Sequence, residues 1–488
     1  MITDGPTDRH GGKGDVHGMR VRAVAGALVL AAVSLAGCSD QADGGDKDSS
    51  PNPFQQAKPL AKLSVPAAYD AGEGWDTALG GVPKRAANVP VVAVPGAGEV
   101  ASIQGAANGY TTIVRAADTG RIKWSSAPWD IPTPNDAESS QTPGVTVVDQ
   151  EGREYIVTYA QGVRGKDALH DGTAVVSLAV YAAEGQGTSV KPLRQIDLPV
   201  EGEPVVRVSA YGGRVLVGLG NMVDSGLYPA RSFAVNVVTG QSTAYDHPDD
   251  LLSPCGQADC ARGRVIAATP EGPLVGVDNG GFGLVGHWFS DSVRPSGTER
   301  TGDLAPFNGL AYGVIDGHVL AGWQTRDKED STAANPMWSV HDLGTGRLQA
   351  SMTCGYDLNN NINAGNYGSN REYGVVASPD GRYLAAGPVV FDLQRKKGIC
   401  LAKSGDRKAI MIVSMRDDGT AYGAVQQDST VEGTEPAAVQ VDLNEGPDTA
   451  KGLGRGTIVP LVTNIKGAGL FLSRDDNGAL RVSLRRER

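Results

Sequence analysis

The chain has 488 residues, of which 40% are apolar, so it is long enough for one large repeat domain or for two or three ordinary ones. Its formal net charge is −11, and its one basic cluster is the C-terminal set Arg481, Arg485, Arg486 and Arg488. Because nucleic-acid binding needs clustered Lys and Arg, this balance argues against a nucleic-acid partner. The 66 glycines and 28 prolines, separated by short apolar runs, indicate many short strands.

A secretory signal is the first feature along the chain. Arg20 and Arg22 precede an apolar run at 23–35, which is shorter than the roughly 20 residues that span a bilayer. Leu-Ala-Gly-Cys follows at 35–38 and resembles the box that ends bacterial lipoprotein signals, whose cysteine is lipidated. We therefore expect residues 1–37 to be removed. Translation starts at Met19, or residues 1–18 extend the signal. An ordinary signal peptide with an incidental cysteine is the alternative.

Residues 38–68 are predicted to be a disordered tether, because this polar stretch with Gly and Pro cannot bury enough apolar surface to order itself. Two or more acyl chains on Cys38, palmitate among them, would hold the protein stably on the outer, extracytoplasmic face of the cell membrane.

The other four cysteines are an even number, as expected for two disulfides outside the cytoplasm. Cys255 with Cys260 would close a short loop, and this pairing leaves Cys354 for Cys400. A zinc site is disfavoured because the sequence has no Cys-x-x-Cys pair and no histidine at ligand spacing beside these cysteines. We expect no metal.

Two alternating glycine turns divide residues 69–488 into similar units. The first joins two apolar strands in a tight hairpin and recurs in seven steps of about 53 residues. Its glycines are Gly98, Gly152, Gly213, Gly272, Gly317, Gly381, Gly419 and Gly467. The second turn follows each third strand, at Gly120, Gly185, Gly240, a degenerate copy near 290–291, Gly346, Gly398 and Gly446. Four strands per unit at this period are typical of a β-propeller.

The last unit lacks one strand. After Gly467 the sequence supplies two strands, at 470–473 and 479–484. The segment 69–79, which carries Trp75, can supply the missing outer strand and close the ring, so that no blade edge stays unpaired. The sequence therefore predicts an all-β propeller of eight four-stranded blades, with seven blades as the alternative if the last two hairpins merge.

Segments 114–124 and 378–385 resemble the repeats of bacterial PQQ-like and WD-type propellers, and with Cys38 the whole chain resembles a propeller lipoprotein. The resemblance covers roughly residues 69–488 and implies a fold far more than an activity. Quinoprotein dehydrogenases with this repeat carry adjacent cysteines over the quinone, together with calcium ligands. This sequence has no Cys-Cys pair, so we expect no cofactor.

The connections between the predicted strands differ in length. In a four-stranded blade, the first-to-second and third-to-fourth turns lie on one side of the ring, here named the turn side. The second-to-third and blade-to-blade connections lie on the other, here named the loop side. The long segments all belong to the loop side, at 127–143, 161–172, 221–231, 247–262, 323–336, 355–371 and 426–435.

Long loops on a rigid scaffold are where binding residues concentrate, so the loop side is the predicted working face. Its candidate binding residues are Trp129, Arg164, His170, Tyr228, Arg231, Trp323, Asn360, Asn363 and Tyr367. Aromatic side chains beside Asn and Arg suit a polar ligand or a protein partner.

Catalytic motifs are missing from the sequence. Five histidines follow the signal without a His-Glu-x-x-His or Gly-x-Ser-x-Gly pattern, and His287, His318 and His341 are expected to pack within strands. The glycines at 281, 283 and 286 match a dinucleotide fingerprint but precede no helix, so we interpret them as strand glycines. Residues 475–478 are predicted to form a hairpin turn rather than a calcium loop.

The sequence thus predicts a membrane-anchored, monomeric, extracytoplasmic propeller that binds a protein partner or a polar ligand without catalysis. The alternative is a propeller hydrolase acting on an envelope or extracellular polysaccharide or ester. Two or three carboxylates converging at the central opening would indicate the enzyme, whereas an opening lined by Asn, Ser and aromatic residues would indicate binding. The identity of the ligand or partner and the type of host envelope do not follow from the sequence.

Overall fold

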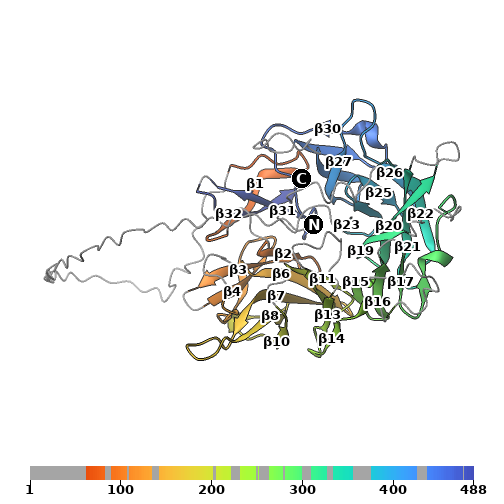
Figure 1. Cartoon of the computed structure of the whole chain (residues 1–488). Coiled ribbons are helices and arrows are strands. Elements are labelled where there is room, and N and C mark those ends of the chain that lie inside the picture. Colours follow the sequence, from red (N-terminus) through yellow and green to blue (C-terminus); the bar gives the residue numbers. More distant parts are fainter. Residues whose placement is uncertain are drawn as a thin grey trace, which may run out of the picture. The chain divides into compact units, whose positions relative to one another are not determined.

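The computed structural model describes residues 62–82, 89–106, 109–134, 142–201, 205–220, 231–248, 251, 263–277, 281–298, 309–326, 334–355, 375–425, 437–475 and 477–488, all within the compact unit Gln56–Arg488. These residues form eight β-sheets that follow one another around a ring (Figure 1), and neighbouring strands in a sheet are antiparallel except in one pair. The helices among them are two 3-10 turns, Ser290–Ser292 and Pro447–Thr449. Within the described ranges no helix has the length and apolar character needed to cross a bilayer.

Seven sheets run outward from an inner strand, in chain order, and each is one blade. Blade 1 contains β2 (Val91–Val94), β3 (Glu99–Ala106), β4 (Gly109–Ala116) and β5 (Ile122–Ser126). Blade 2 contains β6 (Gly144–Gln150), β7 (Arg153–Arg164), β8 (Thr173–Ala182) and β10 (Arg194–Pro199). Blade 3 contains β11 (Val205–Tyr211), β12 (Arg214–Gly220), β13 (Arg231–Asn236) and β14 (Ser242–Tyr245).

The next four blades repeat this plan. Blade 4 contains β15 (Gly263–Thr269), β16 (Gly272–Val277), β17 (Gly281–Leu284) and β18 (Trp288–Phe289). Blade 5 contains β19 (Leu310–Ile315), β20 (His318–Arg326), β21 (Ala334–Asp342) and β22 (Leu348–Thr353). Blade 6 contains β23 (Val375–Ala377), β24 (Tyr383–Ala386), β25 (Val389–Asp392) and β26 (Lys397–Cys400). Blade 7 contains β27 (Ile410–Met415), β28 (Thr420–Val425), β29 (Ala438–Asp442) and β30 (Lys451–Gly452).

Blade 8 closes the ring with strands from both ends of the described chain. It contains β31 (Ala468–Arg474), β32 (Leu480–Glu487) and β1 (Tyr69–Leu79), and residues 461–465 occupy the inner position through a bridge between Val462 and Leu470. Trp75 pairs with Leu484 across the join. The predicted eight-bladed fold and its closing strand are therefore confirmed.

Tryptophans of outer strands join consecutive blades on the turn side. Three indole N–H groups each donate a 2.8 Å hydrogen bond to a carbonyl of the next blade: Trp75 to Ala117, Trp124 to Ala183 and Trp288 to Leu343. Each ring also covers a glycine of that blade: Gly120, Gly185 and Gly346. A Cβ on Gly120 would lie 2.6 Å from the Trp75 ring, and this residue has a φ of +69°. The repeated glycine is thus required both by the turn and by the packed indole.

One turn departs from the prediction. After Gly185 the chain does not return directly as the fourth strand of blade 2, because β9 (Gly187–Val190) first pairs in parallel with β5 of blade 1. Blade 1 therefore has five strands, and β10 takes the outer position of blade 2. The added strand covers the edge of β5, which the four-stranded pattern leaves unpaired.

Blade 4 corrects a second prediction. Its third-to-fourth turn lies at 285–287 rather than near 290–291, so His287 is exposed in a turn instead of packing in a strand. The returning strand β18 lies so close that a Cβ on Gly283 would be 2.5 Å from the Trp288 carbonyl oxygen. The sequence pattern did not reveal this turn because β18, the strand that follows it, has only two residues. In blade 6, likewise, Gly398 lies inside β26 and the turn precedes it.

Candidate functional site

Several predicted site residues lie outside the described part of the chain: Cys38, Tyr228, Cys255, Cys260, Asn360, Asn363 and Tyr367. The structure describes the remaining candidates, namely Trp129, Arg164, His170, Arg231 and Trp323, together with Cys354 and Cys400.

The two candidate tryptophans are buried, so the expectation that they contribute to an exposed binding face is wrong. Trp323 is 2% exposed because β20 and β21 stay paired from His318 to Arg326, which places position 323 inside a strand. Trp129 is 5% exposed, and its backbone pairs with Tyr110 in both directions. Strand length, which the sequence pattern did not fix, decides the burial of Trp323.

Trp323 belongs to a buried polar chain in blade 5. Its indole N–H donates to Ser339 Oγ at 2.6 Å, and Ser339 Oγ lies 2.8 Å from His341 Nε2. His341 Nδ1 donates to the Gly346 carbonyl at 2.9 Å. Ser339 and His341 are both 0% exposed, and burial lowers the pKa of His341 to about 4. A serine beside a histidine can form a nucleophile and its base, but this pair is sealed in the core and serves packing.

Arg164 and Arg231 each hold the preceding blade-to-blade connection on the loop side. Arg164, at the end of β7, binds Asp130 from the connection between blades 1 and 2, with an Nη1–Oδ2 distance of 3.2 Å. Arg231, at the start of β13, binds Glu201 from the next connection at 3.3 Å. Both side chains are about two-thirds or more buried against the protein. Their position on the loop side is as predicted, and their contacts are structural.

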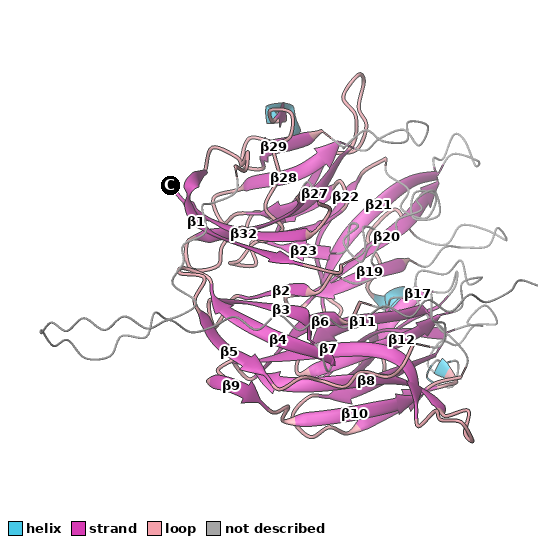
Figure 2. Cartoon of the chain, turned by 90° about the vertical axis from the view of Figure 1, so that its left-hand side faces the viewer, coloured by secondary structure: helices cyan, strands magenta, loops and turns pink. Residues whose placement is uncertain are grey.

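His170 lies in an exposed hairpin tip, residues 165–172, between β7 and β8 (Figure 2). Asp167 Oδ1 accepts hydrogen bonds from the backbone N–H groups of Leu169 and His170, at 2.7 and 2.8 Å, and His170 Nδ1 lies 2.8 Å from the same oxygen. These contacts lower the pKa of Asp167, the N–H of Leu169 having the largest effect. The carboxylate therefore organises the tip.

Leu169 is the residue that this tip presents to solvent. It is 88% exposed, more than any other large apolar side chain in the described part of the chain. Sequence reasoning missed it, since one leucine among polar loop residues is unremarkable until the turn around it is known.

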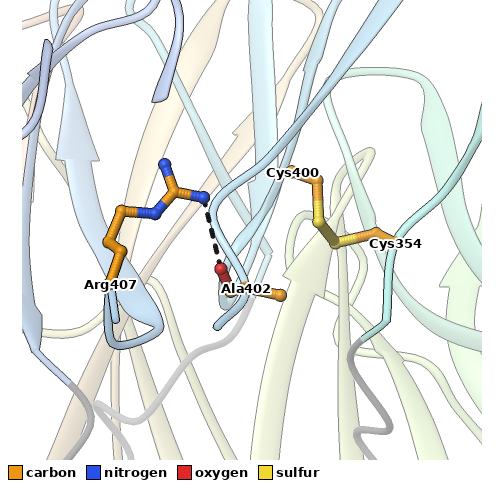
Figure 3. Close-up of a disulfide and its surroundings, with 4 residues drawn as sticks. All are labelled: Cys354, Cys400, Ala402 and Arg407. Atoms are coloured by element: carbon orange, nitrogen blue, oxygen red, sulfur yellow. Dashed lines mark hydrogen bonds between the residues drawn. A yellow bond between two sulfur atoms is a disulfide. The ribbon is translucent and has the colours of Figure 1, made fainter. Parts of the chain in front are cut away.

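A disulfide joins Cys354 to Cys400, as predicted (Figure 3). It links the ends of β22 and β26, the outer strands of blades 5 and 6, on the loop side. Cys354 is 2% exposed, so this bond is shielded from solvent.

A cavity of about 290 Å³ lies among the inner strands of blades 3 to 6. These strands are β11, β15, β19 and β23, which Figure 1 labels. Its polar lining side chains are Arg207, Ser209, Tyr211 and Tyr312, and the rest of the described lining is glycine and aliphatic residues. None of these lining residues is a carboxylate.

The alternation of polar residues along β11 is a sequence signal for this cavity. Arg207, Ser209 and Tyr211 alternate along β11, so their side chains share one face of the strand. Polar residues at alternate positions of an otherwise apolar inner strand indicate a solvent-filled space. Within the described ranges, no three His, Cys, Asp or Glu side chains are grouped closely enough to hold a metal ion.

Comparison with known proteins identifies no family for this chain. No family model and no curated protein matches the chain. Among solved structures, the Dos1 propeller is 11% identical over 85% of this chain and 95% of its own, with a TM-score of 0.40. The β-propeller domain of the Trilobed protease from Pyrococcus furiosus is 8% identical over 71% and 96%, with a TM-score of 0.30. A putative 6-phosphogluconolactonase from Bacteroides fragilis is 10% identical over 78% and 90%, also at 0.30. Likeness at this level carries no argument about activity.

Proposed function

We propose that this protein is a lipid-anchored, extracytoplasmic β-propeller that binds a protein partner on its loop side and catalyses no reaction. The anchor rests on the signal at 20–38 and its final cysteine. The disulfide between Cys354 and Cys400 supports the compartment, because such bonds persist outside the reducing cytoplasm.

The single observation that carries the partner site is the hairpin tip with Leu169. An exposed leucine on a mobile loop would lose conformational entropy on binding, whereas here Asp167 already holds the surrounding backbone. Arg164 fixes the base of the same hairpin through Asp130 and Ser177. The tip thus offers a preorganised apolar contact for a pocket on another protein.

The hydrolase alternative receives no support from the described residues. The one serine and histidine within hydrogen-bond distance, Ser339 and His341, are inaccessible, and the described lining of the central cavity carries no acid to serve as a general base.

The partner site is tested by placing a photo-crosslinking amino acid at position 169 of the full-length protein in its host. Position 238 is the matched control, because Val238 is also an exposed apolar residue, 38% exposed, and lies in a turn-side loop. We expect a discrete crosslinked product from position 169 that position 238 does not give. The same products from both positions, or none from 169, would contradict the partner site.

The anchor is tested separately by metabolic labelling with an alkyne analogue of palmitate. The wild type should incorporate the label and Cys38→Ser should not. Equal labelling of the two chains would rule out Cys38 as the lipidated residue.

A further inference from the structure

The central cavity has the dimensions of a small-molecule site. Its volume of about 290 Å³ corresponds to that of about ten water molecules in the liquid. Aliphatic side chains of three inner strands form much of its wall, among them Val208, Val265 and Val314. Pockets that bind small molecules combine such apolar walls with a few placed polar groups.

Arg207 contributes a positive charge to the wall of this cavity. Arg207 is the charged residue among the described residues that line it, and its side chain is exposed even though it lies on an inner strand. A guanidinium has five N–H donors, so it can bind a ligand while it keeps its contact with the chain. Apolar walls strengthen the attraction between this cation and an anion inside the cavity. The N–H donors of a guanidinium can form two parallel hydrogen bonds to a carboxylate, which favours a carboxylate ligand.

Two hydroxyl-bearing residues lie on β11, the strand that carries Arg207. Ser209 and Tyr211 follow Arg207 at alternate positions of β11, about 7 Å apart for each two-residue step. Ser209 is exposed to the cavity as Arg207 is. Tyr211 lies at the turn-side end, where burial, then Glu271 and Asp316, raise its pKa, so it stays a neutral donor. Glu271 and Asp316 repel an anion from the Tyr211 end of the cavity, so the anion-binding end is at Arg207.

A fourth polar residue, Tyr312, lines the cavity from blade 5. The Tyr312 ring stacks on Trp338 with centroids 4.8 Å apart. It also lies over Gly322, where a Cβ would be 2.8 Å from the ring. Tyr312 is therefore held in place by its neighbours and does not have to be ordered by a ligand.

From this arrangement we propose that the central cavity binds a small hydroxylated monocarboxylate, with its carboxylate on Arg207 and its hydroxyl groups toward Ser209, Tyr211 and Tyr312. This inference goes beyond the proposed partner site on the loop side, and each of the two stands or fails separately.

Calorimetric titration of the full-length protein tests this proposal. The probes are glycolate, glycerate and gluconate, with glycerol and sorbitol as neutral counterparts and inorganic phosphate as a competing anion. We expect at least one hydroxycarboxylate to bind, its neutral counterpart to bind at least tenfold more weakly, and phosphate to bind no better. Arg207→Gln should weaken binding of the carboxylate at least tenfold.

Arg347→Gln is the matched control, because it removes the same charge from an exposed residue that does not line the cavity. It should leave the affinity unchanged. Both variants should show the wild-type unfolding temperature, so that loss of binding is not loss of fold. The proposal is overturned if no carboxylate of the panel binds, if Arg207→Gln binds as tightly as the wild type, or if the polyols or phosphate bind equally well.

Discussion

The turn side and the loop side of the ring join neighbouring blades by different means. On the turn side the contact between a tryptophan and a glycine occurs at three joins, with the same 2.8 Å hydrogen bond each time. On the loop side the joins are of more than one kind: a disulfide between blades 5 and 6, and ion pairs of Arg164 and Arg231 beside blades 2 and 3.

Two kinds of contact are therefore present: repeated contacts, which build the ring, and single contacts, which distinguish this protein from another propeller. Contacts that repeat with the sequence period stabilise any ring with that period. Contacts that occur once shape individual loops, and the exposed Leu169 lies among these. The predictions below test whether the two sides also differ in how much stability they supply.

The largest effect is expected from Trp124→Ala on the turn side. Trp124 is 0% exposed, and its loss should lower the free energy of unfolding by about 3–5 kcal/mol, measured by urea denaturation. Trp288→Ala is the matched control, since it loses the same hydrogen bond from a half-buried ring and should cost less. An equal cost at both positions would show that the hydrogen bond, not ring burial, joins the blades.

The disulfide should supply almost as much stability on the loop side. The two cysteines are 46 residues apart, for which the loss of chain entropy in the unfolded state amounts to about 4 kcal/mol. Cys354→Ala with Cys400→Ala should lose this stability in urea denaturation. The sequence predicts a second disulfide, Cys255 with Cys260, around a much shorter loop, so Cys255→Ala with Cys260→Ala should lose about 2 kcal/mol. The reverse order would mean that native-state strain outweighs chain entropy.

Acid should weaken the turn side of blade 5 through His341. Burial lowers its folded pKa from 6.5 to about 4, so the unfolded chain takes up the proton first as the pH falls. The stability from neutral His341 is full above about pH 6.5 and is lost progressively down to about pH 4, by roughly 3 kcal/mol. His341→Gln should flatten this part of a pH series of urea denaturation curves. A wild-type slope retained in the variant would assign the acid response to other groups.

The smallest effect is expected at the loop-side ion pair of Arg164. Asp130 is 92% exposed, so Arg164→Met should change the unfolding free energy by less than about 1 kcal/mol. The local effect should be larger, because the backbones of Thr133 and Val163 pair beside it. Faster hydrogen exchange at these two amides is expected in Arg164→Met and not in Arg231→Met. Unchanged exchange in both variants would show that the backbone bridge alone holds the connection.

The sequence was sufficient for the ring because the ring depends on residues that recur. Gly120 is needed for its turn and for the Trp75 ring above it, and a tryptophan ring covers the corresponding glycines Gly185 and Gly346 as well. The closing strand followed from an unpaired edge, which is a local physical requirement.

The sequence was insufficient where a single tertiary contact determines how a strand pairs or whether a residue is buried. The parallel pairing of β9 with β5 leaves no trace in a four-strand period. Trp323 was assigned to a loop because the pattern does not say how far β20 continues, and nine paired residues bury it. The roles proposed for Leu169 and Arg207 depend on the turn and the cavity around them. Both form only when the chain folds, so the sequence did not identify either residue.

The pairing of β1 with β32 also constrains when the protein can fold. The partners Trp75 and Leu484 are separated by nearly the whole repeat region, and fully buried Arg485 contacts Asp76 across the same join, at an Nη2–Oδ1 distance of 3.0 Å. A chain that emerges from its N-terminal end presents β1 first and must keep it unpaired until the final hairpin has been made. The circle therefore cannot close before the final hairpin has been synthesised, and a chain truncated before Arg485 lacks the residue that pairs with Asp76.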